Sequence, residues 1–122
     1  MNIIEMEKLR YSIIYAVIRP EITERVSIGL ITVGGGKVDV KYSRKKLDAI
    51  RLLFPQSKYQ YLRKVVMSLS KNQNIGNEGD ISYLSRYSNN LVSVSPLQTI
   101  DIEPTEKSCE WLYRNYIFDR AE

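Results

Sequence analysis

The chain has 122 residues, which suits one domain and is too short for two domains with separate hydrophobic cores. Hydrophobic residues make up 43% and charged residues 26%, a balance that predicts a packed core and excludes wholesale disorder. The net charge of +4 is modest. Histidine is absent and Cys109 is the single cysteine, which excludes His-based catalytic triads and an intramolecular disulfide.

The first part of the chain predicts two β-strands. Residues 9–19 carry apolar side chains at both odd and even positions, as a strand covered on both faces does. Pro20 ends this strand. A second β-rich run follows over residues 25–33, in which Gly29 marks a place where another backbone is expected to come close.

A hairpin turn and a third strand are predicted next. The three glycines at 34–36 separate two strand patterns, which indicates a turn, and residues 37–42 alternate so that one face of the strand meets water. A phosphate-binding loop would need Ser or Thr after its Lys and a helix behind it. Here Val38 occupies that place and a strand follows, so a plain hairpin turn is the better interpretation.

Two helices are predicted after the third strand. Ser43 can cap the first, whose apolar positions extend to Phe54, and Pro55 stops it. Ser57 can cap a second and longer helix, which ends in a polar, glycine-containing loop at residues 74–79. The apolar stripe of the longer helix consists of Tyr59, Leu62, Val65, Val66 and Leu69.

The last third of the chain mixes short elements. Residues 81–87 favour a short helix, and residues 91–95 and 98–102 indicate two short β segments separated by Pro96. Thr105 can cap a final helix. The inner stripe of that helix is expected to contain Cys109, Leu112, Tyr113 and Tyr116.

These elements predict one α+β domain spanning residues 1–122, with an antiparallel or mixed sheet of about five strands packed against three to four helices. Residues 1–10 lack the basic start, apolar stretch and cleavage site of a signal peptide. The longest apolar run near them, residues 13–18, is too short to cross a bilayer. We therefore expect a cytoplasmic protein without membrane association.

A metal-dependent nuclease is one candidate function. Pro20-Glu21 followed by Asp39-Val40-Lys41 has the outline of a nuclease motif in which two carboxylates hold a divalent cation and a lysine steadies the attacking water or the phosphate. Glu21 and Asp39 would be the metal ligands. A solvated strand edge explains the same residues, and we favour that interpretation.

The basic segment is the most informative charge feature, because residues 37–71 contain ten Lys or Arg and two acids. Tyr42, Tyr59 and Tyr61 lie within it as candidate stacking groups for nucleic acid. A solvated basic face also explains the charge and is the interpretation that we favour, while anion binding stays open as the alternative. The candidate anion-binding residues are Lys41, Arg44, Lys45, Lys46, Lys58, Arg63 and Lys64.

Three stretches and the last helix carry a family resemblance. They are residues 11–15 leading into Arg19-Pro20, residues 24–31, residues 90–96, and the helix with Trp111-Leu112 and Tyr116-Ile117. Together they resemble the bacterial domain-of-unknown-function family 3037. The family pattern at the second strand has Asn where this chain has Ser27. The resemblance supplies no catalytic residues, and it implies a partner protein, since members are often encoded beside HipA-type kinases.

A non-enzymatic accessory protein that binds another protein is our leading functional hypothesis. Nine tyrosines favour it, because tyrosine suits half-exposed faces and interfaces. Binding of anions or nucleic acid is the second hypothesis, and the nuclease is the third. No cofactor is expected, and the oligomeric state stays open.

Overall fold

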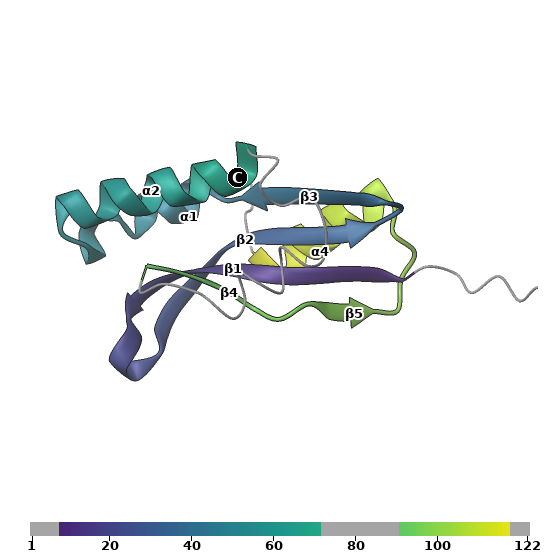
Figure 1. The fold of residues 1–122 in the computed structure, drawn as a ribbon, viewed down its shortest axis with the longest axis horizontal. Coiled ribbons are helices and arrows are strands. Elements are labelled where there is room, and N and C mark those ends of the chain that lie inside the picture. The colour runs from purple at the N-terminus through teal and green to yellow at the C-terminus, as the bar shows by residue number, and fades with distance from the viewer. Residues whose placement is uncertain (1–7, 72–90, 118–122) are drawn as a thin grey trace, which may run out of the picture.

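A computed structural model describes residues 8–71 and 91–117 as one α+β arrangement (Figure 1). The predicted helix at 81–87 lies outside the described residues. The elements in chain order are β1 (Leu9–Arg19), η1 (Pro20–Ile22), β2 (Glu24–Gly34), β3 (Lys37–Tyr42), α1 (Arg44–Ala49), η2 (Arg51–Leu53), α2 (Gln56–Lys71), β4 (Val92–Val94), β5 (Gln98–Ile100) and α4 (Glu106–Ile117).

The five strands form one antiparallel sheet in the order β3-β2-β1-β4, with β5 also paired to β1. Strand β1 pairs with β2 along one edge. On its other edge it pairs first with β5, from Leu9 to Tyr11, and then with β4, from Ile14 to Ala16. The antiparallel five-stranded sheet expected from the sequence is thereby confirmed.

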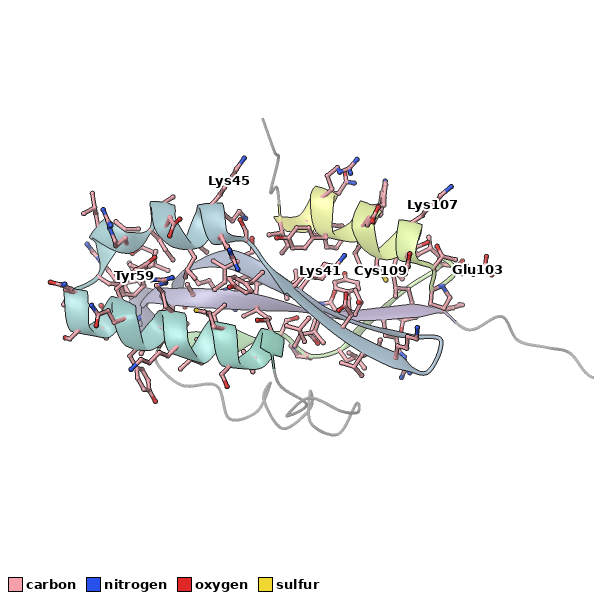
Figure 2. All side chains as sticks on the ribbon, turned by 90° about the horizontal axis from the view of Figure 1, so that it is seen from above. Lys41, Lys45, Tyr59, Glu103, Lys107 and Cys109 are labelled. Atoms are coloured by element: carbon pink, nitrogen blue, oxygen red, sulfur yellow. The ribbon has the colours of Figure 1, made fainter. Side chains whose placement is uncertain are left out.

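Helices cover both faces of this sheet. Ile14 and Ile31 are fully buried in a cluster with residues of α1 and α2, whereas Leu9 and Leu30 are buried in a second cluster with residues of α4. Figure 2 shows α2 and α4 on opposite sides of the strands. This arrangement explains why β1 is apolar at both odd and even positions.

Two predictions about glycines are confirmed. Gly34 pairs with Lys37, and Gly35 and Gly36 form the two-residue turn between β2 and β3 with φ of 60° and 75°. Positive φ at both central positions is the geometry that favours glycine in hairpins. Gly29 lies where β2 and β3 approach closely, because a Cβ there would be 2.7 Å from the carbonyl oxygen of Lys41.

The helices depart from the sequence prediction at two points. The first predicted helix is divided into α1 and η2, and it ends at Phe54 in extended backbone (ψ 149°), as a residue before proline prefers. The second predicted helix starts at Gln56, and in its first turn the amide of Tyr59 donates a hydrogen bond to the carbonyl of Pro55 at 2.9 Å. Ser57 therefore lies within the helix and is not its cap.

Within the described residues, none of the helices combines the length and the apolar character that spanning a bilayer requires.

Substitution Gly29→Ala should lower the free energy of unfolding by about 1–3 kcal/mol, because the new methyl group would push β3 away from β2. Urea denaturation measures the loss. Gly35→Asn is the matched control, since a Cβ at Gly35 meets no atom within 4 Å and Asn tolerates positive φ. Equal stability of the Gly29→Ala variant and the wild type would contradict this packing.

Candidate functional site

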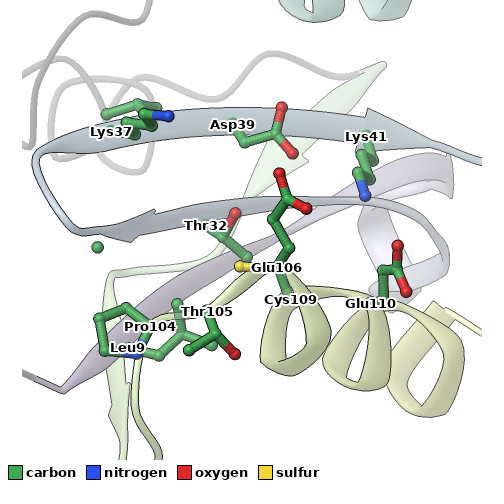
Figure 3. A pocket seen from close by; sticks show the side chains of 12 residues that line it. Leu9, Thr32, Lys37, Asp39, Lys41, Pro104, Thr105, Glu106, Cys109 and Glu110 are labelled. Atoms are coloured by element: carbon green, nitrogen blue, oxygen red, sulfur yellow. The ribbon is translucent and has the colours of Figure 1, made fainter.

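Among the described residues, the groove between β3 and α4 is one surface that combines chemistry-bearing side chains with a hollow (Figure 3). Alternation along β3 points Lys37, Asp39 and Lys41 to the face that α4 covers. Thr105 caps α4 as predicted, its Oγ1 accepting from the amide of Ser108 at 3.1 Å. That cap fixes the first turn of the helix opposite the strand. The groove has a volume of about 620 Å³.

The β3–α4 groove carries both signs of charge. Asp39 on the strand and Glu106 on the helix direct their carboxylates toward each other, and Lys41 points to the side of α4 that carries Glu110 (Figure 3). A phosphate would meet these carboxylates, and a divalent cation would meet the Lys41 ammonium. Among the described residues no group of three or more acidic, Cys or His side chains is arranged to hold a metal ion.

The nuclease hypothesis required Glu21 to join Asp39 and Lys41. Glu21 lies in η1, beyond the end of β2 where Glu24 pairs with Arg19. Asp39 pairs with Thr32, eight residues further along β2, which corresponds to about 26 Å of extended strand. Asp39 and Lys41 therefore share a groove as expected for neighbouring strand positions, but Glu21 belongs to the opposite end of the sheet.

Cys109 lies on the inner side of α4, as predicted, and its burial is intermediate between core and surface. The side chain packs against the buried cluster beneath α4, which contains Leu9, Leu30 and Leu112, and it also lines the β3–α4 groove. It is half-buried and not enclosed in the core. Its neighbours in the stripe, Tyr113 and Tyr116, pack against the same cluster.

The second surface is the helical corner, by which we mean α1, η2 and the first two turns of α2. Ser43 starts the corner: its amide donates to the carbonyl of Ile28 at 2.7 Å, and its Oγ accepts from the amide of Lys46 at 3.1 Å. The Tyr59 hydroxyl donates to the carbonyl of Leu47 at 2.9 Å. These bonds tie α1 to the sheet on one side and to α2 on the other.

The helical corner does not gather the candidate anion-binding residues into one face. Lys41 lies in the β3–α4 groove, and the Lys46 ammonium donates to the carbonyl and hydroxyl oxygens of Ser27 at 2.7 and 3.0 Å.

Along α2, Lys58 lies about 140° from Arg63 around the helix axis. Lys64 lies about 160° from the buried Leu62. Arg44 and Lys45 are exposed on α1.

The predicted stacking tyrosines are also dispersed. Tyr59 is buried in the core, and Tyr42 packs partly against it. Tyr61 is exposed, but it lies about 160° around α2 from Arg63. No two of the three share an exposed face in the arrangement that a nucleic-acid stacking platform would need.

Three arginines do converge on the helical corner. Arg51 and Arg63 line a groove of about 470 Å³ between η2 and α2, and Arg63 also lines a smaller groove with Arg44 and Asp48. Beside the larger groove Leu52 and Leu53 are exposed to 87% and 56%. Arg51 belongs to the basic segment but was not predicted as a binding residue, and neither leucine was predicted. Three apolar residues in succession before Pro55 were the available signal.

The buried Tyr59 hydroxyl has a raised pKa. Burial is the main cause, and the negative charge of Asp48 adds to it, while Arg63 and Arg51 act in the opposite direction. The raised pKa keeps the Tyr59 phenol protonated, so its hydroxyl remains a hydrogen-bond donor to the carbonyl of Leu47. The ring therefore has a structural role under the helical corner.

Comparisons with protein-family models, with curated proteins and with solved structures find no match to this chain.

Substitution Tyr59→Phe should lower the free energy of unfolding by about 1 kcal/mol at neutral pH, through loss of the hydrogen bond to Leu47. Because the folded pKa lies above the ordinary 10.0, the stability that Tyr59 contributes is present below that pH and is lost as pH rises through the raised value. Between about pH 8 and pH 11, the free energy of unfolding should therefore fall less for the variant than for the wild type, as measured by urea titrations at each pH. Tyr61→Phe, at an exposed position, should retain the wild-type decline.

Magnesium or manganese at millimolar concentration should leave the melting temperature within about 1 °C of its metal-free value, because Glu21 is remote from Asp39. Duplex DNA should likewise stay intact in the presence of either ion. Differential scanning fluorimetry and a cleavage assay provide the measurements. A metal-induced stabilisation or cleavage that Asp39→Ala abolishes would restore the nuclease hypothesis.

Proposed function

We propose that this protein is a non-enzymatic accessory module that binds another protein through its helical corner. The observation that carries the proposal is the pair of exposed leucines on η2, 87% and 56% accessible. Full burial of a leucine side chain contributes about 1.5–3 kcal/mol, so two adjacent ones supply a useful part of a docking energy. Adjacent exposed apolar residues beside a groove are a common mark of an interaction site.

The two leucines are presented by a firmly held turn. Ile50 before them and Phe54 after them are both buried in the core. The amide of Leu53 donates to the carbonyl of Ile50 at 3.0 Å, and that of Phe54 donates to Arg51 at 3.4 Å. A surface ordered before binding loses little conformational entropy when a partner docks. This rigidity supports a binding role for η2.

The resemblance to family 3037 supports the same proposal, since it implies a partner protein. A HipA-type kinase in the bacterial cytoplasm is accordingly the partner that we propose to test first. Anion or nucleic-acid binding by the whole basic segment is less well supported, because its seven candidate residues are spread over the β3–α4 groove, α1 and several sides of α2.

The double variant Leu52→Asp/Leu53→Asp should lose its protein partner while keeping its fold, because both side chains are exposed. We expect at least about a tenfold reduction in captured partner. The measurement is affinity capture from the native host, including its HipA-type kinase, with quantitative mass spectrometry.

Ile22→Asp is the matched control, because Ile22 is 61% exposed in η1, outside the helical corner. This variant should retain the partner. Capture that survives the double leucine substitution, or that Ile22→Asp alone abolishes, would contradict the proposed docking surface.

A further inference from the structure

We infer that the segment which docks on the helical corner is acidic and amphipathic, with apolar side chains on Leu52 and Leu53 and carboxylates on Arg51 and Arg63. This inference rests on the proposed protein-binding function and specifies the chemistry of the partner. It assigns the groove between η2 and α2 as the place where the carboxylates bind.

The charge of the helical corner supports an acidic partner. Residues 44–63 contain six Lys or Arg and one acid, Asp48. An excess of positive charge of this kind steers an oppositely charged segment and disfavours a basic one. Asp48 lines the neighbouring groove with Arg44 and Arg63. A carboxylate-rich segment is therefore expected on the Arg51 side.

The arginines suit carboxylates in geometry as well as in charge. A guanidinium presents a planar fork of donors that binds a carboxylate through two parallel hydrogen bonds. Arg51 and Arg63 reach one groove from different elements, η2 and α2. Two such forks at one groove can hold successive acidic side chains of a single peptide.

The flank of α2 continues the groove along the helix. Gln56, Gln60 and Arg63 follow one another at spacings of four and three residues, so they lie on one side of α2, and all three line the groove. The glutamine amides offer both donors and acceptors to a peptide backbone. The groove thus combines an apolar end at Leu52 with a polar wall that a peptide can follow.

The same features disfavour nucleic acid as the occupant. The aromatic rings at this groove, Phe54 and Tyr59, are both buried, so neither offers a free face to a base. Leucines at 87% and 56% exposure contribute little to phosphate binding, whereas they match the apolar face of an amphipathic peptide.

Selection from a display library of random 16-residue peptides on the intact protein tests the inference. We expect the enriched peptides to combine Asp or Glu with Leu, Ile or Phe. Synthetic copies should bind the variants Arg51→Ala/Arg63→Ala and Leu52→Ala/Leu53→Ala at least about tenfold more weakly than the wild type by fluorescence anisotropy.

The matched control is Lys37→Ala/Lys107→Ala, which removes the same charge from exposed positions on β3 and α4, outside the helical corner. It should change peptide affinity less than about threefold. Equal losses in the lysine and arginine variants would show general charge attraction and would overturn the assigned groove. Enriched peptides without an acidic excess, or no enriched peptides, would overturn the partner chemistry.

The remaining measurement is the binding of a fluorescent single-stranded or duplex DNA oligonucleotide to the same variants. Salt-sensitive DNA binding that needs Arg51 and Arg63 but not the leucines would overturn the inference in favour of nucleic acid. Failure of the peptide experiments, with loss of the host partner still caused by the leucine substitutions, would reject the acidic segment alone. The proposed protein-binding function would then remain.

Discussion

Burial of β1 on both faces is the constraint on which the rest of the structure depends. The side chains at one set of alternating positions, such as Ile14, pack toward α1 and α2, and those at the other set, such as Leu9, pack toward α4. A strand of this kind cannot leave either side open to water without exposing a row of large apolar groups. The chain therefore needs helical cover on both faces, and it supplies α1 and α2 before β4 and β5 and α4 after them.

This layering separates the two charged surfaces. The polar side of β3 contributes Lys37, Asp39 and Lys41 to the groove under α4, where three carboxylates outnumber the two lysines. The chain then leaves β3 at Ser43 and forms the helical corner, in which arginines outnumber acids. A segment that is predominantly basic in sequence is thus divided between a groove of mixed charge and a positively charged corner.

Local patterns predicted much of the fold because the deciding interactions are local. The caps at Ser43 and Thr105 and the turn at Gly35-Gly36 depend on neighbouring residues. The break between α1 and η2 was not predicted, because Leu47, Ile50 and Phe54 keep helical spacing while all three are buried. The separation of Glu21 from Asp39 follows from strand pairing, which spacing along the chain does not reveal.

The break bears on the exposure of Leu53 more than on that of Leu52. In a continuous helix Leu52 would lie about 140° from Leu47 and about 160° from Ile50, on the side away from the core, whereas Leu53 would lie about 60° from Ile50, at the edge of the buried face. The η2 turn places Ile50 and Phe54 inside and leaves the two leucines between them facing water. Proline at position 55 makes this outcome stable, because it holds Phe54 in extended backbone and prevents α1 from continuing into α2. Termination of α1 therefore exposes Leu53 next to Leu52, and the same change of direction brings Arg51 and Arg63 to one groove.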